Sequence, residues 1–105
     1  MRALAVTIAK RFAQLPDLPA MNEFLPGYEA SGWLGIGAPK DIDRKIVEML
    51  NVETNAVLTD SEMKARLLGM GIEPTPMSAG EFGKFIAAET DKWAKVVKFA
   101  DIKPK

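Results

Sequence analysis

The chain has 105 residues and a mass of 11.5 kDa, a length that suits one domain and is too short for two domains with separate cores. Its hydrophobic fraction of 48% and its charged fraction of 27% are those of an ordinary folded protein. Fourteen basic residues balance fourteen acidic ones, so no net positive field favours a nucleic acid partner or an anionic membrane surface. The absence of cysteine and histidine excludes thiolate nucleophiles, disulfides, Cys/His zinc sites and the commonest general base. Most familiar hydrolytic and redox mechanisms are thereby excluded, and we expect no cofactor.

The first third of the chain predicts two strands joined by a long connection. The apolar run Ala3–Ala9 contains β-branched residues and is typical of a strand buried on both faces. Three prolines and two glycines interrupt Gln14–Gly32, which predicts an extended connection with one short helical turn between Pro19 and Phe24. Ser31–Ala38 alternates apolar residues with glycines and predicts a second strand, which other backbone approaches closely.

From Asp41 onward the apolar residues recur at helical spacing. They predict an amphipathic helix that reaches about Leu58, with one apolar stripe formed by Ile42, Ile46, Met49, Leu50 and Val57. Thr59 stands three residues before Glu62, and this spacing predicts a capping box that begins a second, short helix.

Ser78 and Glu81 form the same pattern and begin the longest predicted helix, which runs to about Phe99. Its apolar stripe consists of Phe82, Phe85, Ile86, Trp93, Val96 and Val97. We expect this stripe to pack against the helix that begins near Asp41 and to form the core with it.

No set of residues predicts a catalytic or metal site. The glycines of G-W-L-G-I-G at 32–37 match neither the dinucleotide fingerprint nor the Walker pattern. Carboxylate pairs such as Glu89 with Asp91 are two residues apart on a predicted helix, where they point to different sides and favour a solvated surface. Trp93 is predicted to lie in the core. Trp33, flanked by glycine, is the one candidate ligand-binding residue, and simple packing remains the alternative for its ring.

Short segments in a fixed order carry a resemblance to a known family. They are A-L-A-V-T at 3–7, L-P-D-L-P at 15–19, L-P-G-Y-E at 25–29, S-G-W at 31–33, M-K-A-R-L at 63–67, E-P-T at 73–75, S-A-G-E-F at 78–82 and E-T-D-K-W-A-K-V-V at 89–97. Together they resemble the C-terminal part of the solute receptors of tripartite tricarboxylate transporters, also called Bug proteins. One departure is that Lys40 and Asp41 directly follow G-A-P at 37–39, where the family usually has a few more residues, commonly ending Thr-Pro.

The resemblance implies a bacterial, periplasmic, two-lobed α/β binding protein that closes on a small carboxylate and passes it to a membrane permease. The expected fold class is therefore α/β: residues 1–105 form a single unit, the C-terminal third of a periplasmic-binding-protein fold, with two or three short strands and three helices. The expected function is that of a truncated receptor, a natural truncation, gene remnant or excised piece, that does not bind its ligand alone. The alternative is an independent helical protein-interaction module; an enzyme is not expected.

Location and association follow from the same residues. The apolar run Leu4–Ala9 is interrupted by Thr7 and followed by Lys10 and Arg11, so it is too short for an export signal. As written, the chain is expected to stay in the cytoplasm, whereas the parent family is periplasmic. Because the two predicted strands would leave uncovered edges, a homo-dimer is expected. The alternative is a small monomer in which the loop Gln14–Ala30 folds over the strands and the three helices close around it.

Overall fold

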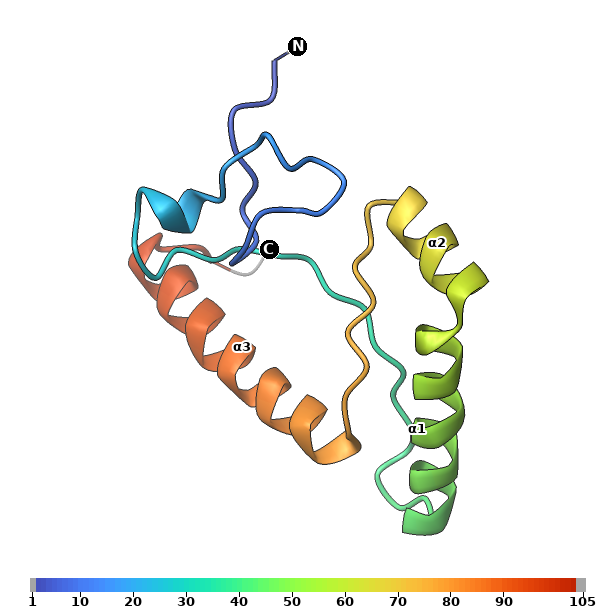
Figure 1. The fold of residues 1–105 in the computed structure, drawn as a ribbon. Helices are drawn as coiled ribbons and strands as arrows, with labels where there is room; N and C mark the ends of the chain where they lie inside the picture. The colour runs from blue at the N-terminus through green and yellow to red at the C-terminus, as the bar shows by residue number, and fades with distance from the viewer. Residues whose placement is uncertain (1, 104–105) are drawn as a thin grey trace. The chain divides into compact units, whose positions relative to one another are not determined.

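A computed structural model describes residues 2–103 and divides the chain into two compact units, Met1–Gly37 and Ala38–Lys105. The elements in chain order are the 3-10 turn η1 (Met21–Glu23) and the helices α1 (Arg44–Thr59), α2 (Ser61–Gly69) and α3 (Ala79–Phe99) (Figure 1). Within residues 2–103 all regular secondary structure is helical, and the expected α/β fold with two or three short strands is wrong.

Neither Ala3–Ala9 nor Ser31–Ala38 forms a strand in the described residues; the first makes only an isolated parallel bridge between Val6 and Ala20. The Val6 N–H donates to the Pro19 carbonyl at 2.9 Å, and the Val6 carbonyl accepts from the Met21 N–H at 2.8 Å. The bridge cannot extend, because Pro19 has no N–H to donate and the chain turns into η1 directly after Ala20. An apolar, β-branched segment therefore does not form a strand here, because it has no neighbouring strand with which to pair.

An ion pair organises the unit Met1–Gly37. The Arg11 guanidinium donates to both carboxylate oxygens of Glu23, with Nε–Oε1 and Nη2–Oε2 distances of 2.8 Å, and its Nη1 donates to the Pro16 carbonyl at 3.2 Å. Glu23 Oε1 also accepts the Ala20 N–H at 2.9 Å. The pair thus connects η1 to the preceding loop around Ala20, which is 1% exposed and is the one fully buried apolar residue that the structure describes. η1 confirms the short helical turn predicted between Pro19 and Phe24.

Local side-chain caps set the boundaries of α1 and α2. Asp43 Oδ1 accepts the Lys45 N–H at 2.9 Å, so α1 begins at Arg44, three residues after the predicted start. α2 is capped by Asp60, whose Oδ1 accepts the backbone N–H groups of the second and third helical residues at 3.1 and 2.9 Å. The predicted capping box at Thr59 is wrong, because Thr59 still belongs to α1 and its hydroxyl donates to a carbonyl one turn back.

The cap of α3 is the one that the sequence predicts. The Ser78 hydroxyl accepts the Glu81 N–H at 3.2 Å, and the Glu81 carboxylate accepts the Ser78 N–H at 2.8 Å. Before it, the extended connection from Gly71 to Ser78 runs back alongside α1 (Figure 1). Gly71, at φ +77°, ends α2 in the left-handed conformation that glycine adopts without strain. No helix within residues 2–103 has both the length and the apolar character that a membrane crossing requires.

The apolar stripes of α1 and α3 are not buried against each other, although the two helices are in contact. The stripe of α1 is exposed at Ile46, Met49, Leu50 and Val57, by 41–58%. Along α3 the residues Ile86, Trp93, Val96 and Val97 are 39–43% exposed, whereas Phe82 and Phe85 are half-buried and stack with ring centroids 6.3 Å apart. The expected apolar core between these stripes is therefore wrong for the described residues.

The Arg11–Glu23 pair predicts a pH dependence of the first unit. The pKa of the Glu23 carboxyl is lowered from 4.5 to about 2, first by the hydrogen bond from Arg11 and then by that from the Ala20 N–H. Because the folded-state pKa is the lower one, the contribution of the pair to folding is complete above pH 4.5 and is lost as the pH falls toward 2. We expect an NMR titration of the Glu23 carboxyl carbon to show a midpoint near pH 2, with the Ala20 amide resonance following it.

In Glu23→Gln the Ala20 amide should no longer respond to pH in this range. The matched control is Glu48→Gln, which breaks an exposed pair with Arg44 in the other unit and should leave the response of Ala20 intact. A Glu23 midpoint at the ordinary value of 4.5 would contradict the prediction.

Candidate functional site

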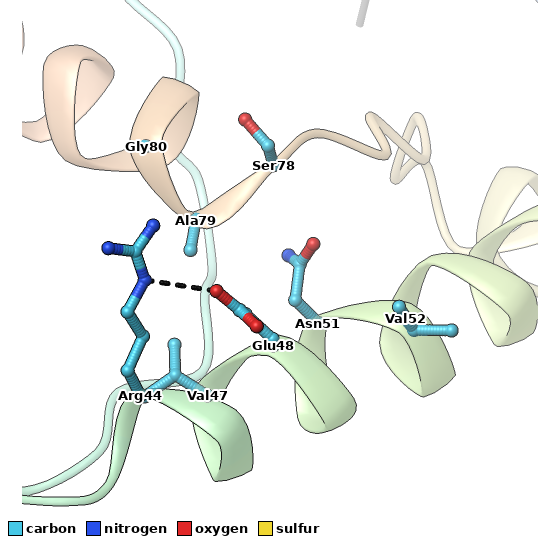
Figure 2. Close-up of a pocket in the computed structure, with 8 residues that line it drawn as sticks. All are labelled: Arg44, Val47, Glu48, Asn51, Val52, Ser78, Ala79 and Gly80. Atoms are coloured by element: carbon cyan, nitrogen blue, oxygen red, sulfur yellow. Dashed lines mark hydrogen bonds and ion pairs between the residues drawn. The ribbon is translucent and has the colours of Figure 1, made fainter.

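The candidate site is a hollow between the N-terminal half of α1 and the start of α3, with a volume of about 300 Å³. We call it the α1–α3 hollow. Figure 2 shows its lining: α1 supplies Arg44, Val47, Glu48, Asn51 and Val52, and the start of α3 supplies Ser78, Ala79 and Gly80. All these residues belong to the unit Ala38–Lys105.

Two asparagines of α1 position the start of α3. Asn51 and Asn55 are one helical turn apart and therefore lie on the same face. Both side-chain amides donate to the Met77 carbonyl at 3.0 Å, and the Met77 N–H donates to Asn55 Oδ1 at 3.2 Å. Because Met77 directly precedes the cap residue Ser78, this Asn55–Met77 clamp places the first turn of α3 beside α1.

The positive groups around the α1–α3 hollow are already paired with carboxylates of the chain. The Arg44 Nε donates to Glu48 Oε1 at 3.0 Å, as the dashed line in Figure 2 marks. At the start of α3, the Glu81 carboxylate accepts hydrogen bonds from the backbone N–H and the hydroxyl of Ser78, both at 2.8 Å, and these bonds lower the pKa of Glu81. The hollow can therefore admit a small polar molecule, but its charges do not favour an anion.

A second polar group lies further along α3. Glu89 is only 8% exposed, and its Oε2 accepts the indole N–H of Trp93 at 2.9 Å. Lys92 forms an ion pair with the same carboxylate, and its Nζ lies 5.7 Å from the centroid of the Trp93 ring. The sequence predicted a solvated Glu89 and a core Trp93, and both predictions are wrong. The signal available in the sequence was the spacing, since Lys92 and Trp93 follow Glu89 at one helical turn.

Trp33, the predicted ligand-binding residue, belongs to the other unit and does not line the α1–α3 hollow. Trp33 is 42% exposed. Its role in binding stays a prediction. Among residues 2–103 no group of acidic side chains is arranged to hold a metal ion.

The sequence places the chain in a known family. The model of the tripartite tricarboxylate transporter family receptor matches residues 1–102. The chain belongs to this receptor family. The resemblance carried by the short segments is thereby confirmed.

Curated relatives of similar sequence come from several bacteria. The chain is 34% identical over 99 residues to a UPF0065 protein encoded between tcbD and tcbE of Pseudomonas sp. strain P51, which covers 92% of this chain and 30% of the relative. It is 33% identical over 99 residues to protein BugT of Bordetella pertussis, covering 93% of this chain and 30% of BugT. With a UPF0065 protein of Bordetella bronchiseptica it shares 30% identity over 104 residues, or 99% of this chain and 31% of the relative. The chain thus spans about 30% of the length of these relatives. No solved structure matches it significantly.

The Asn55–Met77 clamp predicts an unequal effect of two similar substitutions. Asn55→Ala removes both hydrogen bonds to the half-buried Met77 backbone that involve Asn55 and leaves the Met77 N–H without its acceptor. We expect a loss of about 1–3 kcal/mol in the free energy of unfolding, measured by urea denaturation, and faster hydrogen exchange of the Met77 amide.

Asn51→Ala is the matched control, because it removes one hydrogen bond to the Met77 carbonyl and the 3.3 Å bond that Asn51 Oδ1 accepts from Asn55, and it leaves the reciprocal Asn55–Met77 pair in place. It should cost less than about 1 kcal/mol and leave exchange at Met77 slow. Equal losses in the two variants would show that the reciprocal pair has no special role.

Proposed function

We propose that this chain forms the C-terminal part of a periplasmic solute receptor that delivers small carboxylates to the permease of a tripartite tricarboxylate transporter, and that it does not hold its ligand tightly alone. The observation that carries this proposal is the family match over residues 1–102, in a chain with about 30% of the length of its relatives. The other residues of such a receptor would supply the remaining ligand contacts.

The electrostatics of the α1–α3 hollow support weak binding by the chain alone. A carboxylate leaves water at a large cost in free energy unless several donors or a cation replace its hydration. At this hollow, Arg44 is paired with Glu48, and the first turn of α3 is paired with Glu81. A carboxylate ligand would have to displace one of these intramolecular carboxylates, which gains little free energy.

An enzymatic role is not part of the proposal. The chain has neither histidine nor cysteine, and a general base would have to be an Asp, Glu, Lys or the single tyrosine. The candidate carboxylates Glu48 and Glu81 already accept hydrogen bonds from neighbouring groups at the hollow. The family to which the chain belongs is a receptor family.

The proposal predicts the affinity of the chain itself. Isothermal titration of the 105-residue chain with citrate, succinate and glutamate should give a Kd no tighter than about millimolar. Sulfate at equal ionic strength is the control for nonspecific anion binding and should give the same signal. A micromolar Kd for any of the three carboxylates, absent with sulfate, would overturn the proposed dependence on the rest of the receptor.

The role of Trp33 can be tested in a complete receptor. In a chimera in which this chain replaces the matching segment of BugT, we expect citrate, succinate or glutamate to bind, and Trp33→Ala to weaken the tightest of these by about tenfold or more through loss of ring contact. Trp93→Ala is the matched control, because Trp93 is equally exposed, at 42%, and its removal should leave the affinity unchanged. An unaltered affinity in Trp33→Ala would assign Trp33 to packing.

A second candidate function is an independent helical interaction module, favoured by the helical structure of the described residues and by the exposed apolar side chains of α1. The reading frame upstream of Met1 distinguishes the two. A receptor-like frame directly upstream would support the receptor, whereas a promoter of its own would support the module.

A further inference from the structure

Helix α1 has two faces of different character. Val47, Asn51, Asn55 and Leu58 are half-buried and share one face, from which the two asparagines reach Met77. A second face, which we call the outer stripe, carries Ile46, Met49, Leu50, Glu53 and Val57 at spacings of three and four residues. Its apolar members are 41%, 58%, 43% and 48% exposed in chain order.

The outer stripe is more than scattered surface hydrophobicity. Single exposed apolar residues are normal on proteins, but a continuous stripe on one helix face marks an interaction surface. α1 contacts α2 and α3 within its own unit, and the hydrogen bonds to Met77 at the start of α3 come from the asparagine face. The outer stripe therefore has no partner within the unit Ala38–Lys105.

We propose that the outer stripe is the surface on which the rest of the receptor packs, that is, the more than two-thirds of a family receptor that this chain does not span. The inference rests on the proposed function. The occupant is a polypeptide with an apolar face that covers Ile46, Leu50 and Val57, and it brings a lysine or arginine opposite Glu53.

Glu53 identifies the kind of partner. It lies between Leu50 and Val57 on the outer stripe, and it has no ion pair among the described residues. A covered carboxylate needs a cation or hydrogen-bond donors, since an unpaired buried charge is strongly destabilising.

A second copy of the chain does not meet this requirement. In a symmetric pairing of two outer stripes, each copy presents the same surface, whose five members include Glu53 and no lysine or arginine; Lys45 lies outside the stripe, one helical turn before Met49. A receptor segment of different sequence can supply the cation.

The experiment compares Leu50→Ser in two contexts, the 105-residue chain and the BugT chimera. In the chain alone, Leu50 is 43% exposed and the melting temperature should change by no more than about 3 °C. In the chimera the side chain is covered, so the same substitution should lower the melting temperature by more than about 5 °C. Val52→Ser is the matched control: Val52 is an apolar residue of the same helix outside the stripe, 64% exposed, and it should have little effect in either context.

Other outcomes overturn the inference. One is an equal shift of the melting temperature for Leu50→Ser in both contexts, or no shift in either. Another is a chimera that fails to fold when BugT itself folds. A third is light scattering that shows the chain to be a dimer and the Leu50→Ser variant to be a monomer. The last would make a second copy the occupant. Carboxylate binding by the chimera reports separately on the proposed function: a chimera that shows the Leu50 effect but binds no carboxylate keeps the docking surface and removes the proposed function.

Discussion

The Asn55–Met77 clamp is the interaction on which the arrangement of the second unit depends. Asn55 and Met77 are 22 residues apart in sequence, separated by α2 and the extended connection. The clamp holds the returning chain against α1 with two hydrogen bonds in opposite directions. It satisfies the N–H and the carbonyl of one extended residue that has no strand partner, which is the condition for an irregular segment to lie against a helix. The Ser78–Glu81 cap can then begin α3 at a fixed place beside α1.

Polar contacts fix the arrangement of the elements because few apolar side chains are buried. Ala20 is the one fully buried apolar residue among residues 2–103, and the one strongly buried charged residue is Glu89. The first unit follows the same principle, since Arg11 and Glu23 join η1 to the preceding loop. Exposed ion pairs contribute little to stability on their own, so the bidentate geometry and the added Ala20 N–H matter more than the charges.

Features that depend on neighbouring residues were predictable from the sequence, and features that depend on distant ones were not. The Ser78–Glu81 cap and the end of α3 near Phe99 were predicted, because a capping box and a helical period are local. The cap of α2 was missed by one residue, since Asp60 competes with Thr59 for the same role. The strands were wrong because a strand exists only with a partner, and the nearest candidate, at Pro19 and Ala20, can pair at one position only.

The outer stripe of α1 likewise combines a feature that the sequence predicted with one that it did not. Its spacing correctly predicted a helix and the residues that share a face, but the expectation that this face packs against α3 was wrong, because the asparagines occupy the side that faces Met77. At the candidate site, the sequence singled out Trp33, whereas the α1–α3 hollow is built from Arg44, Glu48 and the start of α3. No local motif brings those residues together; the hydrogen bonds of Asn51 and Asn55 to Met77 do. The spacing of apolar residues therefore identifies which face of a helix is suited to packing, but it does not identify the partner that packs there. For this chain, the family to which it belongs is what suggests the partner.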